Sequence, residues 1–230
     1  MKKPYVKNCG KHSGFDVWIV DGKYVRTFIE EEFTNFGQHF RFNFIPENEF
    51  WIDAEHGNHG EEKYYIHHLL VENRLMKAGK NYSQALESAD VLERAERGKL
   101  EFVRNMLDGK DNKHVIEKIH KKLLKKYSSK TNVWVVRGDL VRDLFYVDFT
   151  EGGHDKVYSF IPKQEIWLDD DLSLQEMKFV LLHEIHERNL MAQGKSYDDA
   201  HDSSSEIEYK CRKNPALLDP AIQKEIKLVS

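Results

Sequence analysis

The chain contains two similar segments, and this repetition limits the folds that it can adopt. An offset of 116 residues aligns 17–53 with 133–169 at 15 identical positions of 37. An offset of 115 residues aligns 68–93 with 183–208 at 10 identical positions of 26. A match of this length at a nearly fixed offset predicts two copies of one supersecondary unit. Whatever structure the second half adopts, the first half should adopt as well.

The repeat predicts two lobes joined by a linker. We expect a degenerate first copy over residues 1–97, a helical linker over 98–130 and a second copy over 131–230. In a chain of 230 residues each lobe is then about the size of an ordinary domain. A hydrophobic content of 40% is enough for a packed core in each lobe.

The first part of each lobe has the composition of strands. The run 133–136 is β-branched and aromatic and ends at Arg137-Gly138, and Asp21-Gly22 follows the matching run in the first copy. These dipeptides predict a β-hairpin, with Asp-Gly the stronger turn signal. Further short strands are expected at the alternating segments, which are 40–44, 49–53, 157–160 and 165–169.

The second part of each lobe has the pattern of a helical hairpin. Apolar residues recur at helical spacing from about 173 to 191, and Gly194 is placed to end that helix, as Gly79 is in the first copy. Ser196 can cap a second helix over 197–213. The predicted class is therefore α+β, with a small antiparallel sheet followed by a helical hairpin in each lobe.

Charge and cysteine content argue against several partners. The net charge is -4, so no broad basic field predicts nucleic-acid binding. The basic run from Lys118 to Lys126 is interpreted as a solvated helix face, with a membrane, nucleic acid or an acidic protein as its alternative partners. Two cysteines do not form a disulfide framework, and no long apolar run predicts a signal peptide or a membrane span. We expect a cytoplasmic protein.

Four residues of the second helical hairpin have the spacing of metal ligands. His183 and Glu187 are four apart and His201 and Glu208 are seven apart, so each pair lies on one face of its helix. We expect His183, Glu187 and His201 to hold one zinc ion per chain, with Glu208 as a fourth ligand or as a partner of a ligand. Other divalent metals, including a di-iron or di-manganese pair, remain alternatives.

Each of these residues also has a structural interpretation. His183 could be a core histidine, and His201 could line a surface. Glu208 could pair with Arg212, since Glu93 and Arg97 repeat that spacing. Two positions favour a functional interpretation: the first copy has Leu69 where the second has Glu184, and Leu86 where the second has His201. A copy that loses polar residues at selected positions while keeping its apolar ones indicates decayed chemistry.

The segment H183-E-I-H-E187 resembles the metal-binding helix of zincin-type metallopeptidases, with Glu instead of His at its fifth position. Together with Y197-x-x-A-H201, it resembles small zincin-like proteins of phages and bacteria whose activity is largely unassigned. The resemblance implies that Glu184 is the general base. It also implies that 165–169 is an edge strand that binds an extended peptide or protein substrate through Glu165, Trp167 and Asp169.

The sequence leaves two functions open. One is a zinc-dependent hydrolase, a peptidase in which metal-activated water attacks an amide carbonyl. The other is a binding or scaffold protein, such as a phage accessory protein, in which the metal only staples the helical hairpin. An open coordination position would favour the first, and a closed set of four ligands would favour the second.

Overall fold

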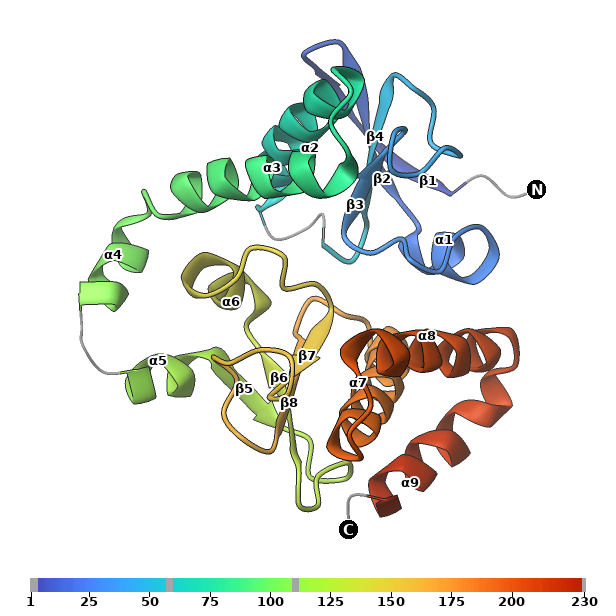
Figure 1. Ribbon diagram of the computed structural model, residues 1–230. Coiled ribbons are helices and arrows are strands. Elements are labelled where there is room, and N and C mark those ends of the chain that lie inside the picture. The colour runs from blue at the N-terminus through green and yellow to red at the C-terminus, as the bar shows by residue number, and fades with distance from the viewer. Residues whose placement is uncertain (1–3, 57–59, 109–111, 229–230) are drawn as a thin grey trace. The chain divides into compact units, whose positions relative to one another are not determined.

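The computed structural model describes residues 4–56, 60–108 and 112–228 (Figure 1). The chain divides into two compact units. Unit 1 consists of Met1–Lys110 and Val141–Asp148, and unit 2 of Asp111–Leu140 and Phe149–Ser230. Each unit has a four-stranded sheet and a helical hairpin, so the predicted α+β class and the two-lobe arrangement are confirmed.

The sheet of unit 1 has the strand order β1-β2-β4-β3. Its strands are β1 (Tyr5–His12), β2 (Phe15–Val20), β3 (Phe36–Gln38) and β4 (Glu49–Asp53). The central pair β2–β4 is parallel, while β1 and β3 are antiparallel to their neighbours. The sheet is therefore mixed, whereas the sequence predicted an antiparallel one.

The sheet of unit 2 repeats this arrangement with the order β5-β6-β8-β7. Its strands are β5 (His120–Leu123), β6 (Asn132–Val136), β7 (Gly152–His154) and β8 (Glu165–Asp169). The parallel pair has the same register in both sheets, since Val17 faces Phe50 and Val133 faces Ile166. Strand β5 lies within the predicted linker 98–130, which is therefore not wholly helical.

The remaining elements of each unit are helices. Those that begin in unit 1 are α1 (Gly22–Phe28), α2 (Glu62–Lys77), α3 (Tyr82–Arg97) and α4 (Glu101–Asp108). Those that begin in unit 2 are α5 (Asn112–Ile119), α6 (Gly138–Leu144), α7 (Glu176–Ala192), α8 (Tyr197–Lys213) and α9 (Leu218–Leu228), with a short 3-10 turn at Pro215–Leu217. Along the described part of the chain, no helix combines the length and the apolarity needed to cross a membrane.

The predicted hairpins are wrong, because a helix follows the first central strand in each unit. Parallel neighbours such as β2 and β4 need a crossover connection, which a tight turn cannot provide. Asp21 instead caps α1 by accepting a hydrogen bond of 2.9 Å from the Tyr24 amide. A Cβ atom on Gly22 would lie 1.9 Å from Oδ2 of Asp53. A glycine is therefore needed here because a side chain would clash with Asp53, and not because the backbone forms a type I′ turn.

The two alternating segments near the Phe-Ile-Pro triplets are also not strands. Residues 40–44 and 157–160 form turns, and the short strands β3 and β7 come before them. By contrast, the strands predicted at 49–53 and 165–169 are present with those bounds, as β4 and β8. The wrong segments have alternating apolar residues, but several of their side chains pack onto aromatic neighbours outside the sheet.

The helical hairpin of unit 2 follows the prediction closely. Helix α7 ends before Gly194, whose φ of 93° is the left-handed conformation typical of glycine after a helix. The side chain of Ser196 accepts a hydrogen bond of 3.2 Å from the Asp199 amide and so caps α8. In unit 1, Gly79 has a φ of 90° and Asn81 caps α3 in the same way.

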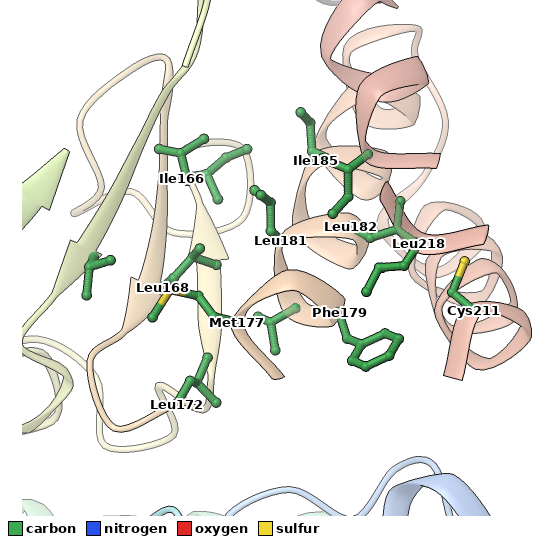
Figure 2. Close-up of a cluster of buried hydrophobic side chains, with 14 residues drawn as sticks. Ile166, Leu168, Leu172, Met177, Phe179, Leu181, Leu182, Ile185, Cys211 and Leu218 are labelled. Carbon is green, nitrogen blue, oxygen red and sulfur yellow. The ribbon is translucent and has the colours of Figure 1, made fainter. Parts of the chain in front are cut away.

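The core of unit 2 lies on both sides of α7 (Figure 2). Ile166 and Leu168 contribute from the sheet, and Leu182 and Ile185 contribute from α7. Cys211 of α8 and residues of α9 extend the same apolar cluster. Helix α7 thus has apolar neighbours on most of its surface, and any polar residue that it directs inward needs a polar partner.

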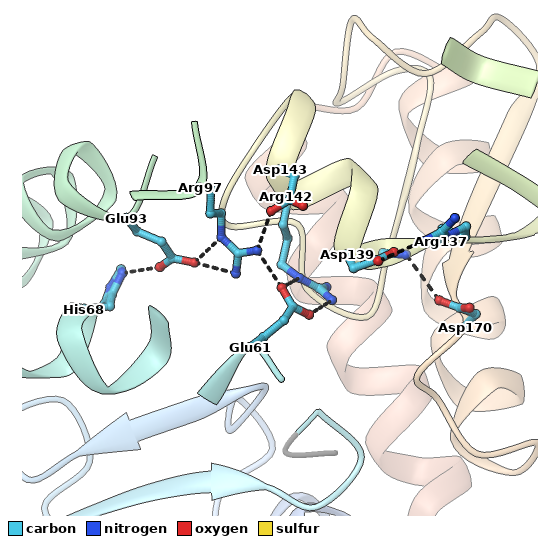
Figure 3. Close-up of polar contacts among 10 residues, drawn as sticks. Glu61, His68, Glu93, Arg97, Arg137, Asp139, Arg142, Asp143 and Asp170 are labelled. Carbon is cyan, nitrogen blue, oxygen red and sulfur yellow. Dashed lines mark hydrogen bonds and ion pairs between the residues drawn. The ribbon is translucent and has the colours of Figure 1, made fainter. Parts of the chain in front are cut away.

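One segment leaves the predicted second lobe. Residues 141–148 belong to unit 1, where Nε of Arg142 donates to Oε1 of Glu61 at 3.0 Å and Nη1 of Arg97 donates to Oδ1 of Asp143 at 2.9 Å (Figure 3). All four side chains are almost completely removed from solvent. Buried charges need such partners, so the ion pairs explain why the segment groups with unit 1.

Candidate metal centre

Three side chains of the helical hairpin of unit 2 bring donor atoms together. His183 and Glu187 come from α7 and His201 comes from the first turns of α8. One donor atom of each lies within 4.8 Å of the other two. The helical spacing predicted the pair on α7, and the tight turn at Gly194 brings α8 back beside it.

The separations within this trio are short. Nε2 of His183 lies 3.6 Å from Oε2 of Glu187 and 3.2 Å from Nδ1 of His201. Nδ1 of His201 lies 2.9 Å from the same Oε2. Two imidazoles and one carboxylate oxygen therefore face a common point, and they are among the ligand types that zinc prefers.

The other nitrogen of His183 is held by a chain of ion pairs. Nδ1 of His183 lies 3.0 Å from Oε2 of Glu208, and Oε1 of Glu208 accepts a hydrogen bond of 2.8 Å from Nε of Arg212. Nη1 of Arg212 then donates to Oε2 of Glu176 at 2.7 Å. Of the two roles expected for Glu208, this geometry matches the partner of a ligand, and the predicted pair with Arg212 is also present. The contact of Nδ1 with Glu208 orients the His183 ring so that Nε2 is directed toward Glu187 and His201.

Charge is concentrated around the trio. Burial alone would raise the pKa of Glu187, but hydrogen bonds from His154, His183 and His201 hold it far below its ordinary value. Burial would lower the pKa of His183, but the carboxylates of Glu187 and Glu208 raise it well above its ordinary value. In the absence of a metal the cluster therefore stabilises positive charge at its centre.

Glu184 lies beside the trio and is not part of it. One of its carboxylate oxygens is within 4.8 Å of donor atoms of Glu187 and His154. Burial, the largest cause, raises the pKa of Glu184 to about 8, and the carboxylates of Glu187 and Glu208 add to this while His183 opposes it.

His154 belongs to the cluster, although sequence reasoning missed it. It is fully buried on β7, and its Nε2 lies 2.9 Å from Oε1 of Glu187. A histidine after two glycines has no helical spacing to reveal it. A signal was present in the repeat, since the matching residue in the first copy is the polar Gln38.

The expected edge strand at 165–169 is corrected. Strand β8 lies between β6 and β7, so it is not an edge strand, and Glu165, Trp167 and Asp169 cannot pair with a substrate there. Glu165 instead binds the ring nitrogens of His120 and Trp167, at 2.9 Å and 2.8 Å. The resemblance had supplied this expectation, which the parallel pairing of β6 with β8 overturns.

His186, also on α7, is directed away from the trio. Its Nε2 lies 3.1 Å from Oγ of Ser203 and its Nδ1 lies 3.0 Å from Oε1 of Glu225 on α9. These contacts use both ring nitrogens. His186 therefore attaches α8 and α9 to α7 and does not face the trio.

Unit 1 has the same helical hairpin without the trio. Nδ1 of His68 lies 2.9 Å from Oε2 of Glu93, and Nε2 of His68 lies 3.8 Å from Oε2 of Glu72. Burial would lower the pKa of His68, but the carboxylates of Glu72 and Glu93 raise it to about 10. Leu69 and Leu86 occupy the positions of Glu184 and His201.

The chain matches no family model, no curated protein and no solved structure.

Proposed function

We propose that unit 2 binds one divalent transition-metal ion, zinc by preference, through Nε2 of His183, Oε2 of Glu187 and Nδ1 of His201. The observation that carries this proposal is the spacing of the three donors. Ligand atoms about 2.1 Å from a tetrahedral zinc ion are about 3.4 Å apart from one another. The separations of 3.6, 3.2 and 2.9 Å bracket that value.

The orientation of the ligand atoms supports the same proposal. A histidine ligand usually donates its second ring nitrogen to a carboxylate, which fixes the tautomer and the ring. Glu208 takes this part for His183. Two histidines and one glutamate form a known catalytic zinc set, in which a coordination position stays open.

We propose further that the site is hydrolytic and that its substrate is an amide bond. The ion would supply Lewis acidity and make water nucleophilic near neutral pH. Glu184, next to His183 in sequence and beside Glu187 in space, would accept the proton of the attacking water in its ionised form, which the charge of a bound ion would favour against the effect of burial on its pKa. The role of Glu184 and membership of the zincin-like group rest on the H183-E-I-H-E187 resemblance.

A non-catalytic metal-binding module is the second candidate. All three residues of β7 are buried and β8 is internal, so the described part of this sheet offers no exposed edge beside α7 for an extended peptide. This observation favours a binding or scaffold role. A stapling role for the metal has less support, because unit 1 forms the same hairpin around His68 without a third ligand.

The cellular setting that we propose is the cytoplasm. Cys9 and Cys211 are both unpaired, which is typical of a reducing compartment. Zinc thiolate chemistry plays no part in the proposal, since neither cysteine belongs to the candidate trio.

The first test is metal content. The protein, purified without a histidine tag and reconstituted with zinc at neutral pH, should contain one equivalent by elemental analysis. Neutral pH is needed because imidazole must lose its proton to bind a metal. Less than about a tenth of an equivalent would contradict the metal site, given the high affinities of zinc sites with three protein ligands.

The second test separates the two candidate functions. Peptide libraries are incubated with zinc-loaded wild type, Glu184→Gln and Glu187→Gln. For a hydrolase, Glu184→Gln should retain zinc and lose about 10²-fold in turnover, as expected for a general base. Glu187→Gln should instead weaken zinc binding. If no peptide is cleaved by wild type and spared by Glu184→Gln, the hydrolase is abandoned for the binding module.

A further inference from the structure

In both units the last residue of the third strand contacts the glutamate at the matching position of the helical hairpin. In unit 1, Nε2 of Gln38 donates to Oε1 of Glu72 at 2.7 Å. In unit 2, Nε2 of His154 lies 2.9 Å from Oε1 of Glu187. The two positions are aligned by the repeat offset, although the residues differ.

A second contact matches as well. The Phe40 amide donates to Oε1 of Gln38 at 2.8 Å, and the Lys156 amide donates to Nδ1 of His154 at 3.2 Å. A glutamine side chain and an imidazole both carry an acceptor and an N–H donor. Each here accepts from a backbone amide two residues later and donates to a carboxylate.

The backbone contact determines the tautomer of His154. Because Nδ1 accepts a hydrogen bond, it carries no proton, and the proton of the neutral ring is on Nε2. An Nε2 that carries a proton has no lone pair for a metal. A ligating His154 would need its proton on Nδ1, where it would point at the Lys156 N–H.

We propose that His154 is a positioning residue that holds Glu187 for one metal ion and is not itself a ligand. This inference rests on the proposed metal site. The Nε2–H of His154 occupies Oε1 of Glu187, which leaves Oε2 as the oxygen that faces His183 and His201. A buried donor on a sheet strand thereby sets which carboxylate oxygen binds the metal.

The competing arrangement is a second ion. His154, Glu184 and Glu187 also place donor atoms within 4.8 Å of one another, and Glu187 would then bridge two metals. The comparison with unit 1 argues against it. Gln38 makes the matching contacts although Leu69 occupies the position of Glu184, so these contacts do not depend on a carboxylate at that position.

The test compares His154→Gln with His154→Leu. Zinc affinity is measured by chelator competition and zinc content by elemental analysis. His154→Gln restores the donor and acceptor of Gln38, so it should retain one equivalent with affinity within about 10-fold of wild type. His154→Leu removes both, and affinity should fall about 10- to 100-fold, the usual loss when a partner of a metal ligand is removed.

A spectroscopic measurement tests the tautomer without relying on zinc or on a variant. Nitrogen-15 NMR of the histidine side chains should show His154 protonated at Nε2 and not at Nδ1, in both metal-free and zinc-loaded wild type. His154→Gln assigns the signal. This readout also covers the case in which His154→Leu fails to fold.

Three results would overturn the inference: two zinc equivalents in wild type with one lost in His154→Gln, loss of all zinc in His154→Gln, or a proton on Nδ1. Wild type that binds no zinc would refute the proposed metal site instead. In that case an Nε2 proton in the metal-free protein would still support the hydrogen bond from His154 to Glu187, and its absence would refute it.

Discussion

The helical hairpins of the two units share one polar framework and differ in what it surrounds. In unit 1 the framework runs from His68 through Glu93 and Arg97 to Glu61, with distances of 2.9, 2.8 and 2.6 Å. In unit 2 the matching distances are 3.0, 2.8 and 2.7 Å. Both units thus share this framework, and in each hairpin it orients the histidine of the first helix in the same way.

The difference lies at two positions beside that histidine. Leu69 and Leu86 in unit 1 correspond to Glu184 and His201 in unit 2. Unit 1 has no second imidazole, and the proton of His68 balances the charge of the surrounding carboxylates. These carboxylates raise the pKa of His68 to about 10. With His201 present, three donors converge and a metal ion can replace the proton. If the proposed metal site is correct, the side chain at position 86 or 201 determines whether a metal ion can take the place of the proton.

The largest effect should come from removing one histidine of the trio. His183→Ala and His201→Ala should each lose the single zinc equivalent, because two ligands rarely hold a divalent ion against water. The measurement is elemental analysis after reconstitution at neutral pH.

The matched control for this loss is His68→Ala, which removes the corresponding histidine of unit 1 and should leave one equivalent bound. Zinc that persists in His183→Ala and disappears in His68→Ala would place the metal site in unit 1 and contradict the proposed site in unit 2.

A large effect on stability is expected in unit 1. His68→Gln removes the buried cation that balances Glu72 and Glu93, so the free energy of unfolding should fall by about 3 kcal/mol at neutral pH. Denaturant titrations measure it. His67→Gln is the control, because its side chain is 51% exposed and should change stability by less than about 0.5 kcal/mol.

The same pair of proteins predicts a pH dependence. The pKa of His68 in the folded protein, about 10, lies above its ordinary value of 6.5. Its stabilising contribution is therefore complete below about pH 6.5 and is lost as the pH rises through about 10. The gap between wild type and His68→Gln should narrow toward pH 10. A gap that widens in that range would contradict the assignment of a charged His68.

An intermediate effect should follow from giving unit 1 the missing imidazole. Leu86→His supplies a third ligand beside His68 and Glu72, so a second zinc ion should bind. Zinc must displace the proton of a histidine whose pKa is raised at this site, as it must at His183, so binding should depend on pH.

Binding at this new site should strengthen as the pH is raised from 7 to 9, which calorimetry can follow. Leu92→His adds a histidine at a more exposed position of α3 and serves as the control, with no second ion expected. Failure of Leu86→His to bind a second ion at either pH would show that the two hairpins differ in more than the side chains beside His68.

The smallest effect should be the same in both units. Gly79→Ala and Gly194→Ala place a Cβ atom at φ values of 90° and 93°, with open space around it. Each should destabilise its unit by about 1 kcal/mol, the backbone cost of a left-handed conformation. Thermal unfolding measures both. Losses that differ by more than about 1 kcal/mol would break the equivalence of the two turns.

Local signals were sufficient to predict the helical hairpins. The glycine stops, the cap at Ser196 and the pair His183/Glu187 depend on residues close in sequence, and each has the expected structure. Strands β4 and β8 were found for the same reason, since an aromatic and β-branched run forms each of them.

Non-local contacts explain the errors. Asp21-Gly22 is a strong turn signal taken alone, but Gly22 packs against Asp53 at the end of a strand that the local sequence does not indicate as a parallel neighbour. The same parallel pairing makes β8 internal and excludes the predicted substrate edge. His154 was missed because its partner Glu187 lies on a distant helix, and only the comparison with Gln38 reveals its role.

Gly22 and Gly138 constrain how sequences with this fold can diverge. A Cβ atom on Gly138 would lie 2.0 Å from Oδ2 of Asp169, as one on Gly22 would from Asp53, and neither glycine belongs to the candidate trio. Substitutions can therefore remove metal ligands while each glycine–aspartate pair stays unchanged. The glycine and the aspartate should therefore be retained in related sequences even where the metal ligands have been lost. A pattern built on them would find lobes that a histidine–glutamate motif overlooks.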